Sequence, residues 1–213
     1  MRPSRMPTTQ VPLADTLDNA RKIVMRQARD WTEVISLKAP NRYALLTESG
    51  ALAGMALEHP GNFLLRWFLK SNRPFEMDVH DAADQSNPQL RLRRPWRWWM
   101  ARLEVADAQG RSIGAIQQRW SWVRRRFDVE APDGRVLASI SGPFWRPWTF
   151  LLEAPGAARE LGRVEKKWSG VVSEMFTDAD TFLVTLPAGD GALRRLLLGA
   201  AVLIDFKFFE KND

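Results

Sequence analysis

Arginine and tryptophan are concentrated in one stretch of the chain, from Arg91 to Arg126. This window holds ten arginines and five tryptophans but only two acidic residues, Glu104 and Asp107. A guanidinium pairs with phosphate oxygens, and tryptophan favours the head-group level of a membrane. The combination predicts a surface for an anionic partner, either phospholipid head groups or nucleic acid. The candidate contact residues are Arg94, Trp96, Arg97, Trp98, Trp99, Arg124, Arg125 and Arg126.

The alternative is that these arginines merely alternate outward on strands whose other face is core. For Arg124 to Arg126, the pattern favours a solvated hairpin loop between two strands over a phosphate contact. Nucleic acid is the less favoured anionic partner, although stacking of bases on tryptophan beside a basic groove would suit Trp120 and Trp122.

Other reactive groups are sparse. The chain has no cysteine, which excludes disulfides, a thiolate nucleophile and cysteine-ligated zinc. Its two histidines, His59 and His80, lack the spacing of a metal pair. No nucleophile elbow, phosphate loop or dinucleotide fingerprint is present. We therefore expect no covalent catalysis, and a transport-type activity at most.

The elements that would carry these residues are β-hairpins. Three stretches, residues 102–120, 127–145 and 150–168, each have two alternating apolar runs around a Gly-containing turn and end on tryptophan. Looser copies occupy residues 42–58 and 75–94. One strand precedes them, at residues 22–28 or 33–37, and one follows at residues 181–187. About a dozen strands at regular spacing indicate a barrel or a sandwich.

The chain reads as one domain with short ends. Residues 1–16 are expected to be a disordered lead, residues 17–210 a single domain, and residues 211–213 a tail. The lead has basic residues but no apolar core, so it is not a secretory signal. Residues 15–31 permit a short helix that runs into a strand.

An uninterrupted apolar run extends from Leu196 to Ile204 near the C-terminus. It is shorter than the roughly 20 residues that a membrane-spanning helix needs, and charged residues flank it on both sides. Because it is apolar all round, it suits a helix enclosed by protein. We therefore predict a mainly β fold: a closed antiparallel barrel of about twelve strands around a central hydrophobic C-terminal helix. Asp205 then needs a backbone or arginine partner.

Two C-terminal segments, "KKWSGVVSEMFTDADTFLVTLP" and "LLLGAAVLIDFKFFE", closely resemble the phospholipid scramblase family. "ISGPFW" (residues 140–145) matches the family pattern as well, and the resemblance extends over residues 17–210. It implies the tubby-like fold shared with LURP-one-related proteins. It also implies calcium-stimulated, bidirectional movement of phospholipids between membrane leaflets without ATP.

Two departures from the family pattern bear on cofactors and attachment. The family's proposed calcium segment begins at the residues matched by Asp178 and Asp180, so calcium is the candidate cofactor. The following residues lack the ligand spacing of an EF-hand loop, which favours a turn that caps a strand. The cysteine-rich, palmitoylated stretch of animal members corresponds here to "RRPWRWWMARLEV". Interfacial tryptophan and arginine could replace that thioester anchor.

The leading expectation is a scramblase-like protein that acts on phospholipids at a membrane surface. It would be cytoplasmic and peripherally membrane-associated, without a transmembrane span. The rival is a non-transporting module that binds anionic lipid or a partner protein, because a barrel filled by its own helix offers no continuous hydrophilic path.

Overall fold

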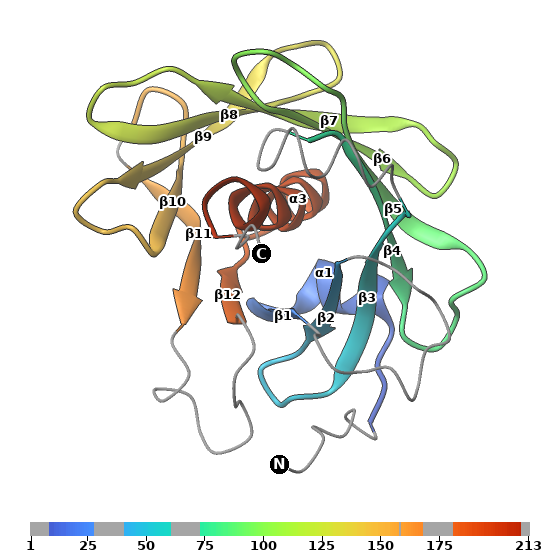
Figure 1. The fold of residues 1–213 in the computed structure, drawn as a ribbon. Coiled ribbons are helices and arrows are strands. Elements are labelled where there is room, and N and C mark those ends of the chain that lie inside the picture. The colour runs from blue at the N-terminus through green and yellow to red at the C-terminus, as the bar shows by residue number, and fades with distance from the viewer. Residues whose placement is uncertain (1–8, 28–40, 61–72, 158, 168–180, 210–213) are drawn as a thin grey trace, which may run out of the picture.

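The computed structural model describes residues 9–27, 41–60, 73–157, 159–167 and 181–209. Within these ranges, twelve strands form a closed barrel accompanied by two helices (Figure 1). The helices are α1 (Leu13–Asn19) and α3 (Gly191–Phe208). The strands are β1 (Lys22–Gln27), β2 (Arg42–Leu46), β3 (Leu52–Glu58), β4 (Phe75–Asp81), β5 (Pro88–Arg94), β6 (Arg102–Asp107), β7 (Ser112–Arg119), β8 (Arg124–Glu130), β9 (Val136–Pro143), β10 (Thr149–Glu153), β11 (Glu160–Lys167) and β12 (Thr181–Thr185).

The barrel is an antiparallel up-and-down arrangement. Each strand pairs with its neighbours in sequence, and β1 closes the ring by pairing with β12, where Ile23 lies opposite Val184. Full closure removes the exposed edges that a sheet of this size would otherwise present. The predicted fold class, a closed barrel of about twelve strands, is confirmed.

All five predicted hairpins are present, from β2–β3 to β10–β11. Their alternation explains the register. In β4, for example, Phe75, Met77 and Val79 are buried in the lumen, and Glu76 between them is exposed. Since side chains in a strand alternate between faces, every second residue of each strand enters one common core.

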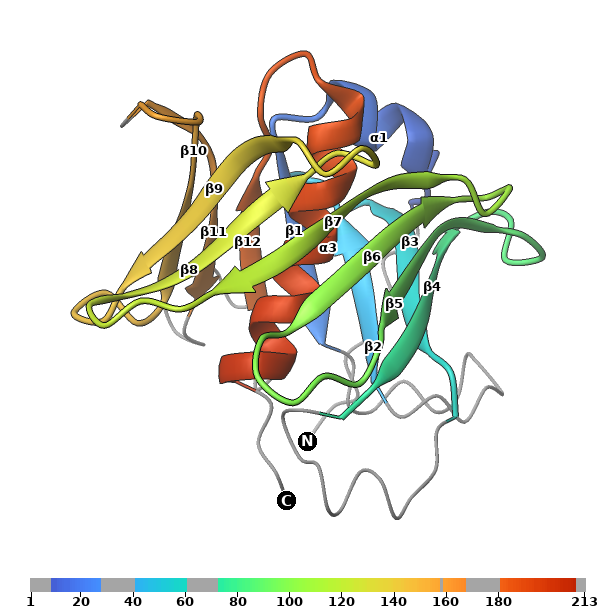
Figure 2. The same ribbon diagram turned by 90° about the horizontal axis from the view of Figure 1, so that it is seen from above.

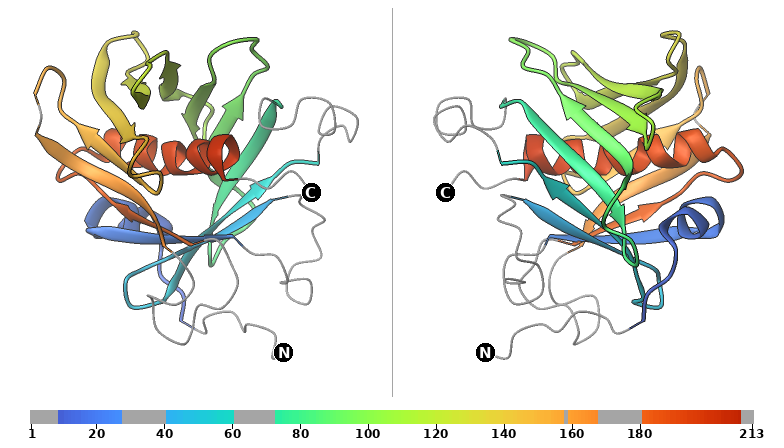
Figure 3. Two further views of the ribbon diagram at one scale, coloured as in Figure 1. Left: turned by 60° about the vertical axis from the view of Figure 1, so that its left-hand side comes forward. Right: turned by 90° about the vertical axis from the view of Figure 1, so that its right-hand side faces the viewer.

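Helix α3 runs through the barrel as its central element (Figures 2 and 3). Every residue from Leu196 to Phe206 is buried, as the all-round apolarity of the segment predicts. The carboxylate of Asp190 caps the first turn by accepting a hydrogen bond from the Leu193 amide at 3.0 Å. Among the described residues, no helix combines the length and apolarity needed to cross a membrane.

The buried carboxylate of Asp205 accepts a hydrogen bond from the wall of the barrel. The hydroxyl of Tyr43, on β2, donates to its Oδ2 at 2.5 Å. The sequence pattern indicated a backbone or arginine partner and did not single out this tyrosine, which lies 162 residues away. This bond ties the C-terminal part of α3 to strand β2.

The described domain includes residues before the predicted boundary at Leu17, while residues 1–8 of the predicted lead lie outside the described residues. Helix α1 starts at Leu13, which is fully buried and lies against Gly54 of β3. A short helix followed by strand β1 is confirmed, but the helix belongs to the core instead of beginning after a disordered lead. The alternative first strand, residues 33–37, and the tail, residues 211–213, lie outside the described residues.

Candidate functional site

Large apolar side chains are exposed in only three places among the described residues. These are the connections β5–β6 (residues 95–101), β7–β8 (residues 120–123) and β9–β10 (residues 144–148). Trp99 is 88% exposed and Trp122 81% exposed, far above what is usual for the largest apolar side chain. The complete set is Trp96, Trp98, Trp99, Trp120, Trp122, Val123, Phe144 and Trp145.

The three connections lie at one end of the barrel. Each joins an odd-numbered strand to the next even-numbered one, and in an up-and-down barrel such connections all fall at the same end. Helix α3 also ends there, since Phe208 contacts the rings of Phe127 and Phe150 near the starts of β8 and β10. We call these three connections the tryptophan end. Exposed apolar groups gathered in this way mark an interaction surface.

The indole rings of the tryptophan end are organised in pairs. Trp96 and Trp98 meet edge to face with ring centroids 4.7 Å apart, and Trp120 and Trp122 do so at 4.4 Å. Edge-to-face contact fixes each ring relative to its neighbour. Two of the three connections therefore each present a pair of tryptophan rings in mutual contact.

Positive charge accompanies the exposed rings. Each connection carries or adjoins an exposed arginine, namely Arg97, Arg124 and Arg146, and none of these forms an ion pair with a described residue. The three connections contain no aspartate or glutamate. These three connections are therefore cationic as well as aromatic.

The structure separates the predicted contact residues into two groups. Trp96, Arg97, Trp98, Trp99, Arg124 and Arg126 are exposed. Arg94 is not part of this surface, because it is 3% exposed and follows the core-facing residues of β5.

The expectation that Arg124 to Arg126 form a solvated hairpin loop is wrong, because these residues open strand β8. Arg126 faces outward and pairs with Asp128 at 3.6 Å. Arg125 faces inward, and its guanidinium carbon lies 4.6 Å from the centre of the Phe150 ring.

Sequence reasoning missed the third connection. Phe144, Trp145 and Arg146 repeat the tryptophan and arginine pairing outside the window from Arg91 to Arg126. A signal was available, since the hairpin of residues 127–145 ends on tryptophan like its neighbours.

The proposed calcium residues, Asp178 and Asp180, lie outside the described residues. Within the part of the chain that the structure describes, no three acidic or histidine side chains are grouped closely enough to hold a metal ion.

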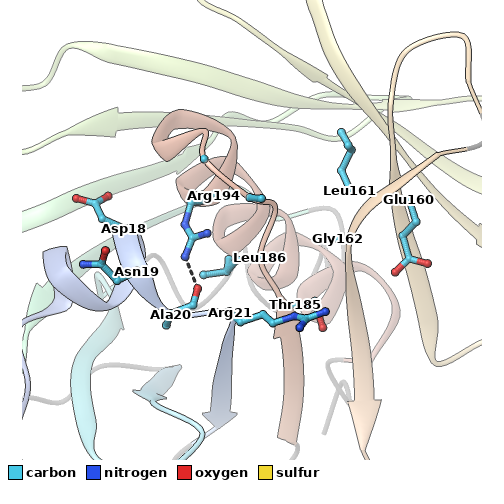
Figure 4. A pocket seen from close by; sticks show the side chains of 12 residues that line it. Asp18, Asn19, Ala20, Arg21, Glu160, Leu161, Gly162, Thr185, Leu186 and Arg194 are labelled. Atoms are coloured by element: carbon cyan, nitrogen blue, oxygen red, sulfur yellow. Dashed lines mark hydrogen bonds between the residues drawn. The ribbon is translucent and has the colours of Figure 1, made fainter.

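A hollow of about 570 Å³ lies at the opposite end of the barrel, between α1, β11, β12 and the start of α3 (Figure 4). Its lining carries both signs of charge, with Asp18 and Glu160 beside Arg21 and Arg194. The guanidinium of Arg194 is already engaged, because it donates to the backbone carbonyls of Leu17, Ala20 and Pro187. We interpret this hollow as a structural junction and the tryptophan end as the functional site.

The family of the chain follows from a comparison with protein-family models. The family model described as Scramblase matches residues 2–211. The chain therefore belongs to the scramblase family. Human phospholipid scramblase 2 is 26% identical over 94% of this chain and 71% of its own length. Human phospholipid scramblase 1 is 26% identical over 97% of this chain and 70% of its own length.

The scramblase relatives extend to fungi, and the fold extends to plants. A phospholipid scramblase family protein of Schizosaccharomyces pombe is 26% identical over 94% of this chain and 62% of its own length. The X-ray structure of an Arabidopsis thaliana protein matches with a TM-score of 0.51 at 14% identity, covering 91% of this chain and 98% of that one. This likeness shows the tubby-like fold alone.

Proposed function

We propose that the protein acts on phospholipids at a membrane surface and docks there through the tryptophan end. The observation that carries this proposal is the gathering, at one end of the barrel, of exposed indole rings and arginines on three described connections that contain no acidic residue. Indole rings insert at the head-group level, while each arginine near an anionic surface contributes about 1 kcal/mol. The names of the scramblase relatives agree with a phospholipid as the partner.

The finer proposal is that docking leads to bidirectional movement of phospholipids between leaflets without ATP. Calcium, acting through Asp178 and Asp180, is the candidate stimulus. Purified protein in liposomes with fluorescent lipid and a quencher that reaches only the outer leaflet tests this activity. A faster loss of the protected fluorescence, with or without calcium, supports movement. If the rate of fluorescence loss is unchanged both with and without calcium, the proposal of lipid movement is wrong.

The second candidate is a phospholipid-binding module that moves nothing. The filling of the barrel by α3 favours it, because buried side chains from Leu196 to Phe206 leave no hydrophilic path through the lumen. Vesicle binding without lipid movement is the outcome that this candidate predicts.

Removing the three exposed arginines of the tryptophan end is expected to weaken binding to anionic vesicles. The variant is Arg97→Gln/Arg124→Gln/Arg146→Gln. At about 1 kcal/mol for each arginine, the partition coefficient should fall roughly hundredfold at low salt. Co-sedimentation with vesicles of phosphatidylserine and phosphatidylcholine measures it, and the difference should shrink in high salt.

A charge-matched control is available at the other end of the barrel. Arg111, Arg135 and Arg159 are exposed at the opposite hairpin turns, so their triple glutamine variant has the same net charge. Its vesicle binding should stay within about threefold of the wild type, since only distant charges change. Equal losses in the two triple variants would show that net charge alone drives binding and that the tryptophan end has no special role.

A further inference from the structure

Arg125 occupies a position that its strand reserves for core residues. It is in phase with Phe127 and Val129, which are fully buried, and out of phase with the outward-facing Arg124 and Arg126. Its guanidinium therefore turns into the mouth of the barrel. There it lies beside two stacked rings, 4.6 Å from the centre of Phe150 and 4.9 Å from that of Phe208.

The charge of Arg125 has no counter-ion among the described residues. Its Nε and Nη2 atoms are buried and meet no hydrogen-bond acceptor there. Burial accordingly lowers the pKa of Arg125. Stacking on the two rings offsets part of this cost, but it supplies no acceptor for the N–H groups.

Two buried carboxylates at this end of the described structure are already engaged. Asp205 accepts the hydroxyl of Tyr43. Glu58 accepts hydrogen bonds from Asn41, at 2.7 Å, and from Arg73. Neither acid is free to neutralise Arg125.

Further cations lie near the aromatic rings at this end of the barrel, which are those of Phe150, Phe182, Phe208 and Phe209. The Nζ atom of Lys166, on β11, lies 4.5 Å from the centre of the Phe209 ring and 5.6 Å from that of Phe182. Burial and the nearby positive charge of Arg94 lower the pKa of Lys207. Several cationic side chains among the described residues therefore lie against the aromatic rings of the mouth.

This combination suits a phosphate group better than other anions. A guanidinium fork donates to two phosphate oxygens at once and leaves further oxygens of the phosphate for other donors, whereas a peptide carboxylate offers two oxygens in all. The exposed rings of Trp122 and Trp145 rim the same end, at the level where head groups would lie once the protein is docked. A membrane phospholipid supplies both the phosphate and the apolar body that such a rim accommodates.

We propose that the mouth of the barrel, between β8 and the C-terminal end of α3, binds the phosphate of one membrane phospholipid, with Arg125 as the principal contact. This site rests on the proposed function, since it requires the tryptophan end to face the membrane. The docking surface and this site have different roles. The exposed arginines of the docking surface attract the protein to an anionic membrane, whereas Arg125 binds the head group of one lipid molecule.

The test uses the full chain, a short-chain phosphatidylserine below its micellar concentration, and the thermal midpoint as readout. The lipid should raise the midpoint of the wild type and of Arg124→Gln. In Arg125→Met, the affinity derived from that rise should fall tenfold or more, because a hydrogen-bonded charge is lost. Without lipid, Arg125→Met should melt at the same temperature as the wild type or higher, since methionine removes an uncompensated charge and keeps the volume.

Each outcome decides one point. Equal lipid responses in Arg125→Met and the wild type overturn the site. A lower midpoint of Arg125→Met without lipid, together with an unchanged lipid response, shows that Arg125 serves only the fold. A rise of the same size with glycerol 3-phosphate overturns the assignment to a lipid, because a free phosphate ester then suffices.

Vesicle co-sedimentation separates this proposal from the proposed function. Arg125→Met should keep its vesicle binding within a few fold, because the exposed rings and arginines remain. If the wild type does not bind vesicles yet responds to short-chain lipid, docking fails and the site is one for dispersed lipid molecules instead of lipid in a membrane. If it binds vesicles and does not respond to short-chain lipid, the site fails and docking stands.

Discussion

Replacing Gly114 by alanine is expected to destabilise the protein by at least about 3 kcal/mol, at the upper end of what overpacking a core costs. Gly114 lies in β7, and a Cβ atom there would sit 2.2 Å from the backbone carbonyl oxygen of Glu130 on β8. It would also sit 3.2 Å from a methyl group of Leu196 on α3. A backbone oxygen held in a closed barrel cannot move aside as a flexible side chain does. Urea unfolding followed by tryptophan fluorescence should show a lower midpoint at an unchanged slope.

Gly134→Ala is the matched control. Gly134 has a φ of +84°, which alanine disfavours, but nothing lies within 4 Å of its Cβ position. This variant should cost about 1 kcal/mol from backbone strain alone. If Gly114→Ala costs no more than Gly134→Ala, then β7 and β8 can separate without loss, and the close approach of these strands does not stabilise the barrel.

The same close approach recurs around the barrel. Gly54 in β3 and Gly162 in β11 would each place a Cβ atom 2.5 Å from a carbonyl oxygen of the adjacent strand. Each of the three glycines pairs with its hairpin partner beside a shift of register. Bulges of this kind increase local twist, which a sheet needs in order to close. The recurrence at β3, β7 and β11 indicates three corners at which the barrel bends around its helices.

The fold could be predicted from the sequence because its signals are local. Alternation with period two around Gly-containing turns identified the hairpins, and apolarity on every side identified α3 as an enclosed helix. The bond from Tyr43 to Asp205 could not be predicted in this way. It joins residues 162 apart, and nothing in the neighbourhood of either residue points to the other.

The residue types of the candidate site could be predicted from the sequence, but the directions of their side chains could be predicted less well. Tryptophan and arginine marked two of the three connections. The same criterion failed for Arg94 and Arg125, whose side chains follow the inward phase of β5 and β8. Arginine is a polar residue, so its type predicted that both side chains would lie on the surface. Their position in the alternation of each strand predicted that both would point into the lumen. Strand phase was the correct guide for both residues.

Replacing Arg194 by methionine is the second change with a large expected effect. The side chain is 5% exposed, and its three nitrogen atoms donate to the carbonyls of Leu17, Ala20 and Pro187. These carbonyls lie in the last turn of α1, in the turn from α1 to β1 and in the connection from β12 to α3, so one guanidinium joins the two helices. Figure 4 shows its bond to Ala20. Methionine would leave three carbonyl oxygens without this donor, at about 1 kcal/mol or more for each. We therefore expect a loss of about 3 kcal/mol or more in the free energy of unfolding.

The neighbouring arginine provides the control for this experiment. Arg195 donates to the carbonyl of Gly191 within its own helix and pairs at 3.0 Å with Asp18, whose side chain is 53% exposed. An exposed pair of this kind contributes less than about 1 kcal/mol, so Arg195→Met should unfold close to the wild type. Arg194→Lys should resemble Arg194→Met, because an ammonium group on a flexible stem cannot reproduce the planar fork. Equal stability of Arg194→Met and Arg195→Met would mean that other donors or water replace the guanidinium. The first and last elements would then be held together by apolar contacts alone, such as those of Leu17 and Leu193 in the shared core.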